Sequence, residues 1–113
     1  MFKKNNYKRI PEKISIGGQE LSIDIVDKIS GNCLGRCCLG GGFIQISDVF
    51  GEDVKQSDSS KQNTFFHEVV HAILGTMGEA KLDANEKFVS SFSSFLTEAM
   101  KDAIFIENEE YNI

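Results

Sequence analysis

Hydrophobic and polar positions form their clearest pattern in the second half of the chain. From Phe65 to Leu74 every position is apolar except His67, Glu68 and His71. A segment that is apolar almost all round is typical of a helix buried inside its domain. We therefore predict a buried helix here, and its three polar residues need an explanation.

A second helix is predicted over Asp83 to Ile106, where apolar residues recur at steps of three and four. They form one stripe, which we expect to cover the first helix. The stripe comprises Phe88, Val89, Phe92, Phe95, Leu96, Ala99, Met100 and Ala103. Gly75 and Gly78 lie between the two helices and supply the break that a tight return requires.

The first half of the chain alternates with a period of two, as β-strands do. Lys13 to Ile16 and Leu21 to Val26 alternate on either side of Gly17-Gly18, which predicts a β-hairpin. Phe43 to Ser47 predicts a further strand, directly after a run of glycines. The hairpin and this strand indicate a small sheet with one buried face.

A polar segment from Asp48 to Asn63 separates the strands from the helices and predicts a surface loop. Within it we expect a short helical turn near Val49 to Val54. Asn63 or Thr64 is expected to cap the helix that follows, and Ser59-Ser60 offers an earlier start.

These elements predict an α+β fold in which a small antiparallel or mixed sheet packs on two helices. With 113 residues, the chain is expected to form a single domain over 1–113. A chain of this length builds one hydrophobic core and leaves no room for a second lobe.

The polar positions of the buried helix form the pattern His67-Glu68-Val69-Val70-His71, or H-E-x-x-H. Residues four apart lie on one face of an α-helix, so both imidazoles can bind one ion. Glu68 is rotated about 100° from His67 and would reach a water on that ion rather than the ion itself. The pattern indicates a zinc hydrolase, in which the metal acidifies water and the carboxylate takes the proton.

An H-E-x-x-H pattern also arises by chance, in a helix whose histidines have other partners. The burial predicted for this helix favours the metal, because an unpaired buried polar group costs about 1–3 kcal/mol. A shared Zn²⁺ explains three such groups together.

The third ligand must be an acid or a cysteine, because the chain has only two histidines. We expect it on the second helix. Glu86 borders the apolar stripe in the first turn, whereas Asp102 lies four turns further along and Glu98 points more to solvent. An acid in a first turn is otherwise ordinary, because the helix dipole favours it there. The acids downstream of the motif are Glu79, Asp83, Glu86, Glu98 and Asp102.

The run TFFHEVVHAILGTMG, followed after a short linker by DANEKFVSSFSSFL, resembles the small zincin-like metallopeptidases of phage and mobile elements. These are relatives of the gluzincins and of the ImmA/IrrE-like peptidases. The resemblance implies that His67 and His71 are zinc ligands, Glu68 the general base and Glu86 the third ligand. It covers Thr64 to Leu96 well and the amino-terminal half only in outline. The spacing from His71 to Glu86 is shorter than in large gluzincins.

The same resemblance implies a peptide-bond hydrolase acting on a protein or peptide, with an intracellular regulatory protein as a candidate substrate. In zincins an edge strand beside the metal pairs with the extended substrate, a role implied here for Phe43 to Ser47 or its neighbour. A plain core strand is the alternative. Zincins usually add a donor for the oxyanion, and this chain offers only Tyr7, Arg9, Arg36 and Tyr111. No motif places any of them, so we expect activity that is weak or dependent on a partner.

Composition narrows the class of protein. A net charge of -5 argues against a general nucleic-acid binder, and no apolar run approaches the ~20 residues that cross a bilayer. We therefore expect neither nucleic acid nor membrane as a partner. The basic start, Met1 to Arg9, leads into Ile10-Pro11-Glu12 without the apolar core of a secretory signal. A cytoplasmic location is expected, whereas the oligomeric state has no signature in the sequence.

Three cysteines lie close together, at Cys33, Cys37 and Cys38. Their odd number argues against a disulfide framework, so reduced thiols are expected. Two alternatives are a second metal site and a thiolate that inhibits the enzyme by occupying the open zinc position. Adjacent cysteines seldom bind one ion together, and no histidine remains to complete such a site.

Two other functions compete with a zinc peptidase. In the first, the ion ties the helices together in a non-catalytic interaction module. In the second, the protein regulates a repressor by binding it without cutting it. Structural zinc sites normally close all four positions with protein ligands, whereas only three are evident here. This count favours an open, catalytic site.

Overall fold

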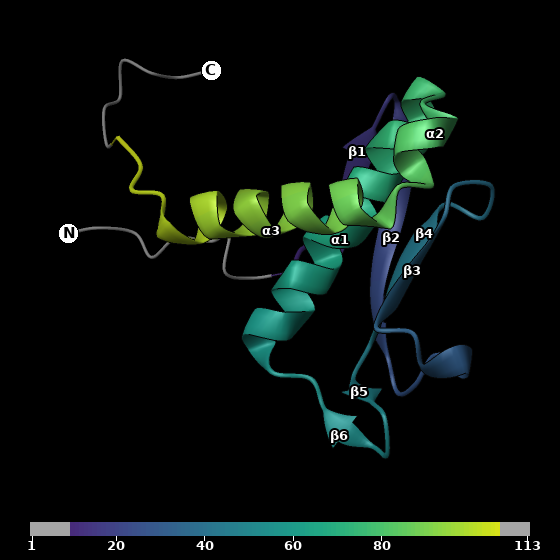
Figure 1. Ribbon diagram of the computed structural model, residues 1–113, viewed down its shortest axis with the longest axis vertical. Helices are drawn as coiled ribbons and strands as arrows, with labels where there is room; N and C mark the ends of the chain where they lie inside the picture. Colours follow the sequence, from purple (N-terminus) through teal and green to yellow (C-terminus); the bar gives the residue numbers. More distant parts are fainter. Residues whose placement is uncertain (1–9, 107–113) are drawn as a thin grey trace.

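The computed structural model describes residues 10–106 (Figure 1). Its main sheet has four strands, and a two-stranded sheet lies at one end. The strands are β1 (Lys13–Ile16), β2 (Gln19–Val26), β3 (Gly35–Cys38), β4 (Phe43–Ser47), β5 (Val49–Phe50) and β6 (Val54–Lys55). The helices are α1 (Asp58–Met77), α2 (Ala80–Asp83) and α3 (Glu86–Asp102), with a 3-10 turn at Ser30–Asn32. The α+β prediction is confirmed.

The main sheet is mixed, with strand order β1-β2-β4-β3. β1 and β2 form the predicted hairpin, which turns at Gly17 and Gly18, both with positive φ. β2 pairs with β4 in parallel, and β3 pairs with β4 antiparallel. The strand predicted over Phe43 to Ser47 is therefore central, and β3, which the sequence did not predict, forms one edge of the sheet, with β1 at the other.

One face of the sheet packs on α1. The core consists of buried aliphatic residues of β2 and β4 together with Phe65 and Ala72 of α1. On the other side of α1, Val70 and Leu74 pack with Val89 of α3. α1 therefore lies between the sheet and α3 and contacts both, as Figure 1 shows. The aliphatic residues of the sheet are Leu21, Ile23, Ile44 and Ile46.

α1 begins earlier than either predicted start. The Ser57 hydroxyl accepts a hydrogen bond from the Ser60 amide and caps the helix, so the caps predicted at Asn63 or Thr64 are wrong. The polar residues before Asn63 form the first turns of the helix, which the Ser57 cap starts despite their low hydrophobicity. At the other end Gly78 adopts the left-handed conformation with φ 76°, as a helix end requires.

The helical turn predicted near Val49 to Val54 is also wrong. This segment forms the antiparallel pair β5 and β6, in which Phe50 lies opposite Val54. Gly51 and Asp53 adopt positive φ values of 56° and 60°. Left-handed residues so close together are incompatible with a right-handed helical turn and favour a tight hairpin.

The second predicted helix is divided in two. α2 ends at Asp83, and the Asn85 side chain then accepts a hydrogen bond from the Phe88 amide and starts α3 at Glu86. Of the predicted stripe, Val89 is buried, whereas Phe92 and Phe95 are exposed. The expectation that the whole stripe covers α1 is therefore wrong.

No helix in the part of the chain from residue 10 to residue 106 is long and apolar enough to cross a membrane.

Candidate metal centre

The two motif histidines lie on the same face of α1, one turn apart. Their ring centroids are 4.9 Å apart, and the exposed fractions of the side chains are 23% for His67 and 20% for His71. Both imidazoles are therefore directed into a half-buried site that solvent still reaches. The spacing of four residues places them there, as the sequence predicted.

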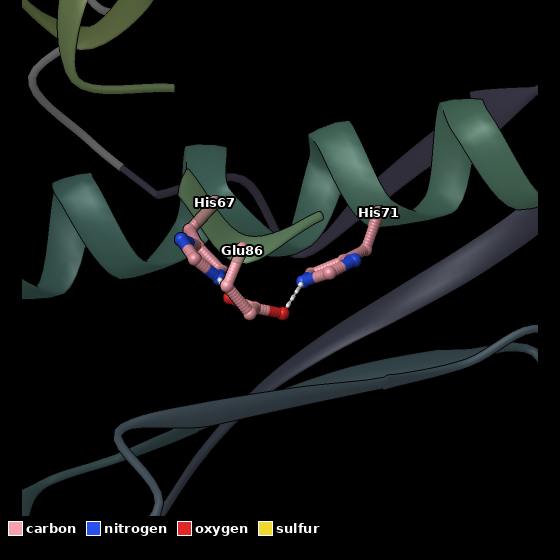
Figure 2. Close-up of side chains that lie close together, drawn as sticks. All are labelled: His67, His71 and Glu86. Carbon is pink, nitrogen blue, oxygen red and sulfur yellow. Dashed lines mark ion pairs between the residues drawn. The ribbon is translucent and has the colours of Figure 1, made fainter. Parts of the chain in front are cut away.

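Glu86, the first residue of α3, brings its carboxylate between the two imidazoles. One carboxylate oxygen lies 3.3 Å from His67 Nε2, and the other lies 3.1 Å from His71 Nε2. Figure 2 shows the three side chains converging from α1 and α3. Among the described residues, these three form the group whose ligand atoms lie close enough together to hold a metal ion.

These separations allow the three residues to share one metal ion, because one ligand atom of each lies within 4.8 Å of the others. Donor atoms at about 2.0–2.1 Å from a tetrahedral zinc ion lie about 3.3–3.4 Å from one another. The 3.1 Å and 3.3 Å between Glu86 and the imidazoles are close to this value, but they involve different carboxylate oxygens and are also the distances of two ion pairs. Two imidazole nitrogens and one carboxylate oxygen are also a ligand set that zinc uses in catalytic sites.

The other acids considered from the sequence are not in this group. Glu79, Glu98 and Asp102 are exposed and lie outside the group formed by the two histidines and Glu86. Glu86 is distinguished because the turn at Asn85 starts α3 beside the histidines, so its first residue faces them.

Asp83 has a different role from the one considered for it. Its carboxylate lies 2.7 Å from His71 Nδ1, the ring nitrogen that faces away from Glu86. A carboxylate in this position accepts a hydrogen bond from Nδ1–H and leaves Nε2 free to bind a metal. The sequence cannot distinguish a residue that supports His71 from a metal ligand. The distance between Asp83 and His71 depends on the turn that follows α2.

Comparisons with known proteins give no relative. No family model, no curated protein and no solved structure matches this chain. The candidate centre therefore stands on its own residues and their geometry.

Glu68 lies on the inner side of the same cleft and is only 7% exposed. Burial, aided by the negative charges of Glu86 and Asp83, raises the pKa of its carboxyl to about 7, although His71 opposes the shift. None of the described residues donates a hydrogen bond to this carboxylate or pairs with it. A carboxyl group with a pKa near neutrality can both accept and release a proton at physiological pH.

The two imidazoles differ in their protonation. Burial, followed by the charge of His71, lowers the pKa of His67 despite the opposing effect of Glu86. Burial also acts to lower the pKa of His71, but the hydrogen bond to Asp83 and the surrounding carboxylates outweigh it and raise that pKa. His67 is therefore the more readily neutral of the two, and a neutral imidazole is the form that binds a metal.

The three side chains open into a cleft of about 690 Å³ between α1 and the edge of the sheet. One wall carries the histidines and Glu68, and the other is formed by β3 and the residues next to it. The residues of that second wall include Leu34, Gly35, Cys37 and Leu39. The edge strand beside the cleft is thus the neighbour of Phe43–Ser47, and Phe43–Ser47 itself is a core strand.

Gly35 allows β3 to approach α1 closely at this point. A Cβ atom there would lie 2.6 Å from the Thr64 methyl group and 3.3 Å from Glu68 Cγ. Real side chains do not approach at 2.6 Å, so one element would have to move. The absence of a side chain at Gly35 therefore sets the width of the cleft.

We expect Gly35→Ala to destabilise the protein by about 1–3 kcal/mol, the usual penalty for overpacking. Gly40→Ala is the matched control, because a Cβ there meets nothing within 4 Å. Urea denaturation of both variants and the wild type measures the difference. Equal free energies of unfolding would show that β3 and α1 separate easily.

The three cysteines are free, and only Cys37 is half-buried. Burial, followed by the charge of Glu68, raises the pKa of the Cys37 thiol to about 11. It is therefore a neutral thiol at physiological pH and a poor metal ligand. Cys38 accepts a hydrogen bond from the Gly41 amide. None of the three belongs to the group of residues that could hold an ion.

Arg36, a candidate donor for the oxyanion, is among the residues that line the cleft, but its side chain contacts other residues of the sheet. Its Nε donates a hydrogen bond of 2.6 Å to Gln45 Oε1, and its guanidinium lies over the Phe43 ring. Alternation along β3 directs this side chain to the face of the sheet opposite α1. The other candidates, Tyr7, Arg9 and Tyr111, lie outside the described residues.

Removing the carboxylate of Asp83 tests its support of His71. We expect Asp83→Ala to weaken zinc binding by about 10- to 100-fold, the usual effect of losing such a hydrogen bond to a metal-bound histidine. Competition with a chromophoric chelator measures the affinity. Glu79→Ala, an exposed acid outside the metal-binding group, is the control. An unchanged affinity for Asp83→Ala would show that packing alone orients the imidazole.

Proposed function

We propose that this protein is a zinc-dependent metallopeptidase. The observation that carries the proposal is the position of Glu86, whose two carboxylate oxygens lie 3.3 Å and 3.1 Å from the Nε2 atoms of His67 and His71. Three ligands with a buried acid beside them are the parts of an open, catalytic zinc site. The resemblance of the motif to small zincin-like metallopeptidases of phage and mobile elements points the same way.

A zinc ion held by His67, His71 and Glu86 would supply a Lewis acid and lower the pKa of a water molecule to about 7. Glu68 would accept the proton of the attacking water, for which its pKa of about 7 suits it. The same carboxyl would then return the proton to the leaving amine. Asp83 would hold His71 in the tautomer that presents Nε2 to the site.

The proposed substrate is a protein or peptide in an extended conformation. β3 is an edge strand of the main sheet and forms one wall of the cleft. A peptide that pairs with β3 would therefore pass His67 and His71. Pairing through backbone hydrogen bonds gives affinity without reading much sequence. A cytoplasmic location and a regulatory protein as substrate belong to this proposal.

A non-catalytic zinc module is the alternative. A structural site normally has four protein ligands. The metal-binding group here has three, and its third ligand, Glu86, is 65% exposed. Such a site leaves a position for water, which favours the peptidase.

The test is to incubate the zinc-loaded protein with a mixture of unstructured peptides and to identify products by mass spectrometry. We expect new peptide termini that disappear when a chelator removes the metal. Stable binding of peptides without new fragments would favour the third function, a regulator that binds its partner without cutting it.

A further inference from the structure

An exposed row of aromatic side chains runs along α3. Phe92 is 50% exposed and Phe95 72% exposed, and the ring of Phe92 stacks on that of Phe88 at 5.7 Å. Together with Ala99 they recur at steps of four, three and four, which is the spacing of one helix face. We call Phe88, Phe92, Phe95 and Ala99 the phenylalanine stripe.

The position of Glu86 explains why Phe92 and Phe95 face outward. Val89, Ser93 and Thr97 follow Glu86 at helical spacing and are buried against α1, with the Thr97 hydroxyl 3.3 Å from Asn63 Oδ1. This buried row includes two polar residues, Ser93 and Thr97, although α3 also contains the larger apolar residues Phe92 and Phe95. The rotation of α3 that brings Glu86 to the histidines therefore turns Phe92 and Phe95 outward, whereas Phe88, at the amino end of the stripe, is half-buried against the core cluster that includes Val89.

Two opposite charges lie along one edge of the stripe. Lys87 and Glu98 are eleven residues apart, which is about three full turns, so they lie at nearly the same angle around α3. Both are exposed, and neither forms an ion pair with a residue that the structure describes. The positive charge lies near the amino end of the stripe and the negative charge near its carboxyl end.

We propose that this face binds a second copy of the chain, with the two α3 helices antiparallel and a two-fold axis beside Phe92. In an antiparallel pair, the same edge of each helix meets across the axis. Lys87 of each copy then lies opposite Glu98 of the other, and Phe88 of each fits between Phe95 and Ala99 of the other. In a parallel pair the two-fold axis would run along the helices and place this edge of the two copies on opposite sides of the interface, so Lys87 and Glu98 would not pair.

This interface is independent of the proposed function. On α3, Glu86 lies on the side that faces α1, away from the exposed Phe92 and Phe95. Dimer formation therefore leaves the cleft open. Circular dichroism then reports whether each variant keeps its fold.

The proposal is tested by measuring the oligomeric state of variants in which the charges of Lys87 and Glu98 are reversed. Sedimentation equilibrium of the full chain over a range of concentrations should show a wild-type dimer. We expect Lys87→Glu and Glu98→Lys each to weaken the dimer roughly tenfold, because each turns two attractive pairs into repulsive ones. The double variant carries both changes and should return to the wild-type affinity. Phe95→Ser should leave only monomer.

A wild-type protein that is monomeric at every concentration would overturn the proposal. The stripe would then have another partner, either a different protein or the ends of the same chain. A dimer that persists in Phe95→Ser, or one that the double charge variant fails to restore, would also overturn it. An unchanged circular dichroism spectrum in each variant excludes unfolding as the cause.

Discussion

Purified protein is expected to contain one zinc ion per chain, and His71→Ala is expected to lose it. The reason is that His67, His71 and Glu86 form the group of described residues that could hold an ion. With one imidazole removed, two ligands remain, and the loss should exceed the roughly 10- to 100-fold effect of removing an outer-shell partner. Glu86→Ala should weaken binding in the same way. Elemental analysis and competition with a chelator measure both effects.

The matched control is Glu79→Ala, which removes an exposed acid outside the metal-binding group and should keep the zinc. Lowering the pH is a second check, because a protonated imidazole cannot bind a metal. The pKa of His71 is raised in the metal-free site, so protons compete with zinc for this imidazole, and the zinc affinity should fall as the pH is lowered. A wild-type protein without zinc, even after reconstitution, would make the motif a chance match and favour an interaction module without metal.

Glu68→Gln is expected to abolish peptide cleavage while the zinc remains bound. An amide cannot take the proton of the attacking water, and loss of a general base typically lowers the rate by about 10²- to 10⁴-fold. The carboxyl is buried with a pKa of about 7, so a neutral amide of the same shape is expected to leave the fold intact. Assays of fragments and of zinc content on the same preparation measure both quantities.

This variant separates the catalytic site from a structural one. A structural zinc site has no use for Glu68, so Glu68→Gln would then behave as the wild type in every assay. Turnover that survives the substitution would rule out Glu68 as the base while leaving the zinc site intact. Loss of zinc in the variant would instead assign the carboxylate to the metal.

Much of the fold follows from local patterns. The hairpin at Gly17 and Gly18, the strand from Phe43 to Ser47 and a buried helix over the motif are all present. Each has a strong local cause, either alternation with glycine turns or an apolar run. The helix start was predicted wrongly because Ser57 caps a polar turn that hydrophobicity does not mark. β3 was missed because cysteine and glycine carry little strand signal, and its pairing with β4 creates it.

The sequence by itself determined that two imidazoles share one helix face with a carboxylate between them, because helical periodicity depends on spacing alone. It also pointed to Glu86. Only the tertiary structure decided that Asp83 supports His71 and that Gly35 brings β3 to the cleft. It also decided which side of α3 is buried. An apolar stripe shows that a helix has a face to bury, whereas its partner depends on how the chain folds back, here with Glu86 at the histidines and Phe92 and Phe95 outside.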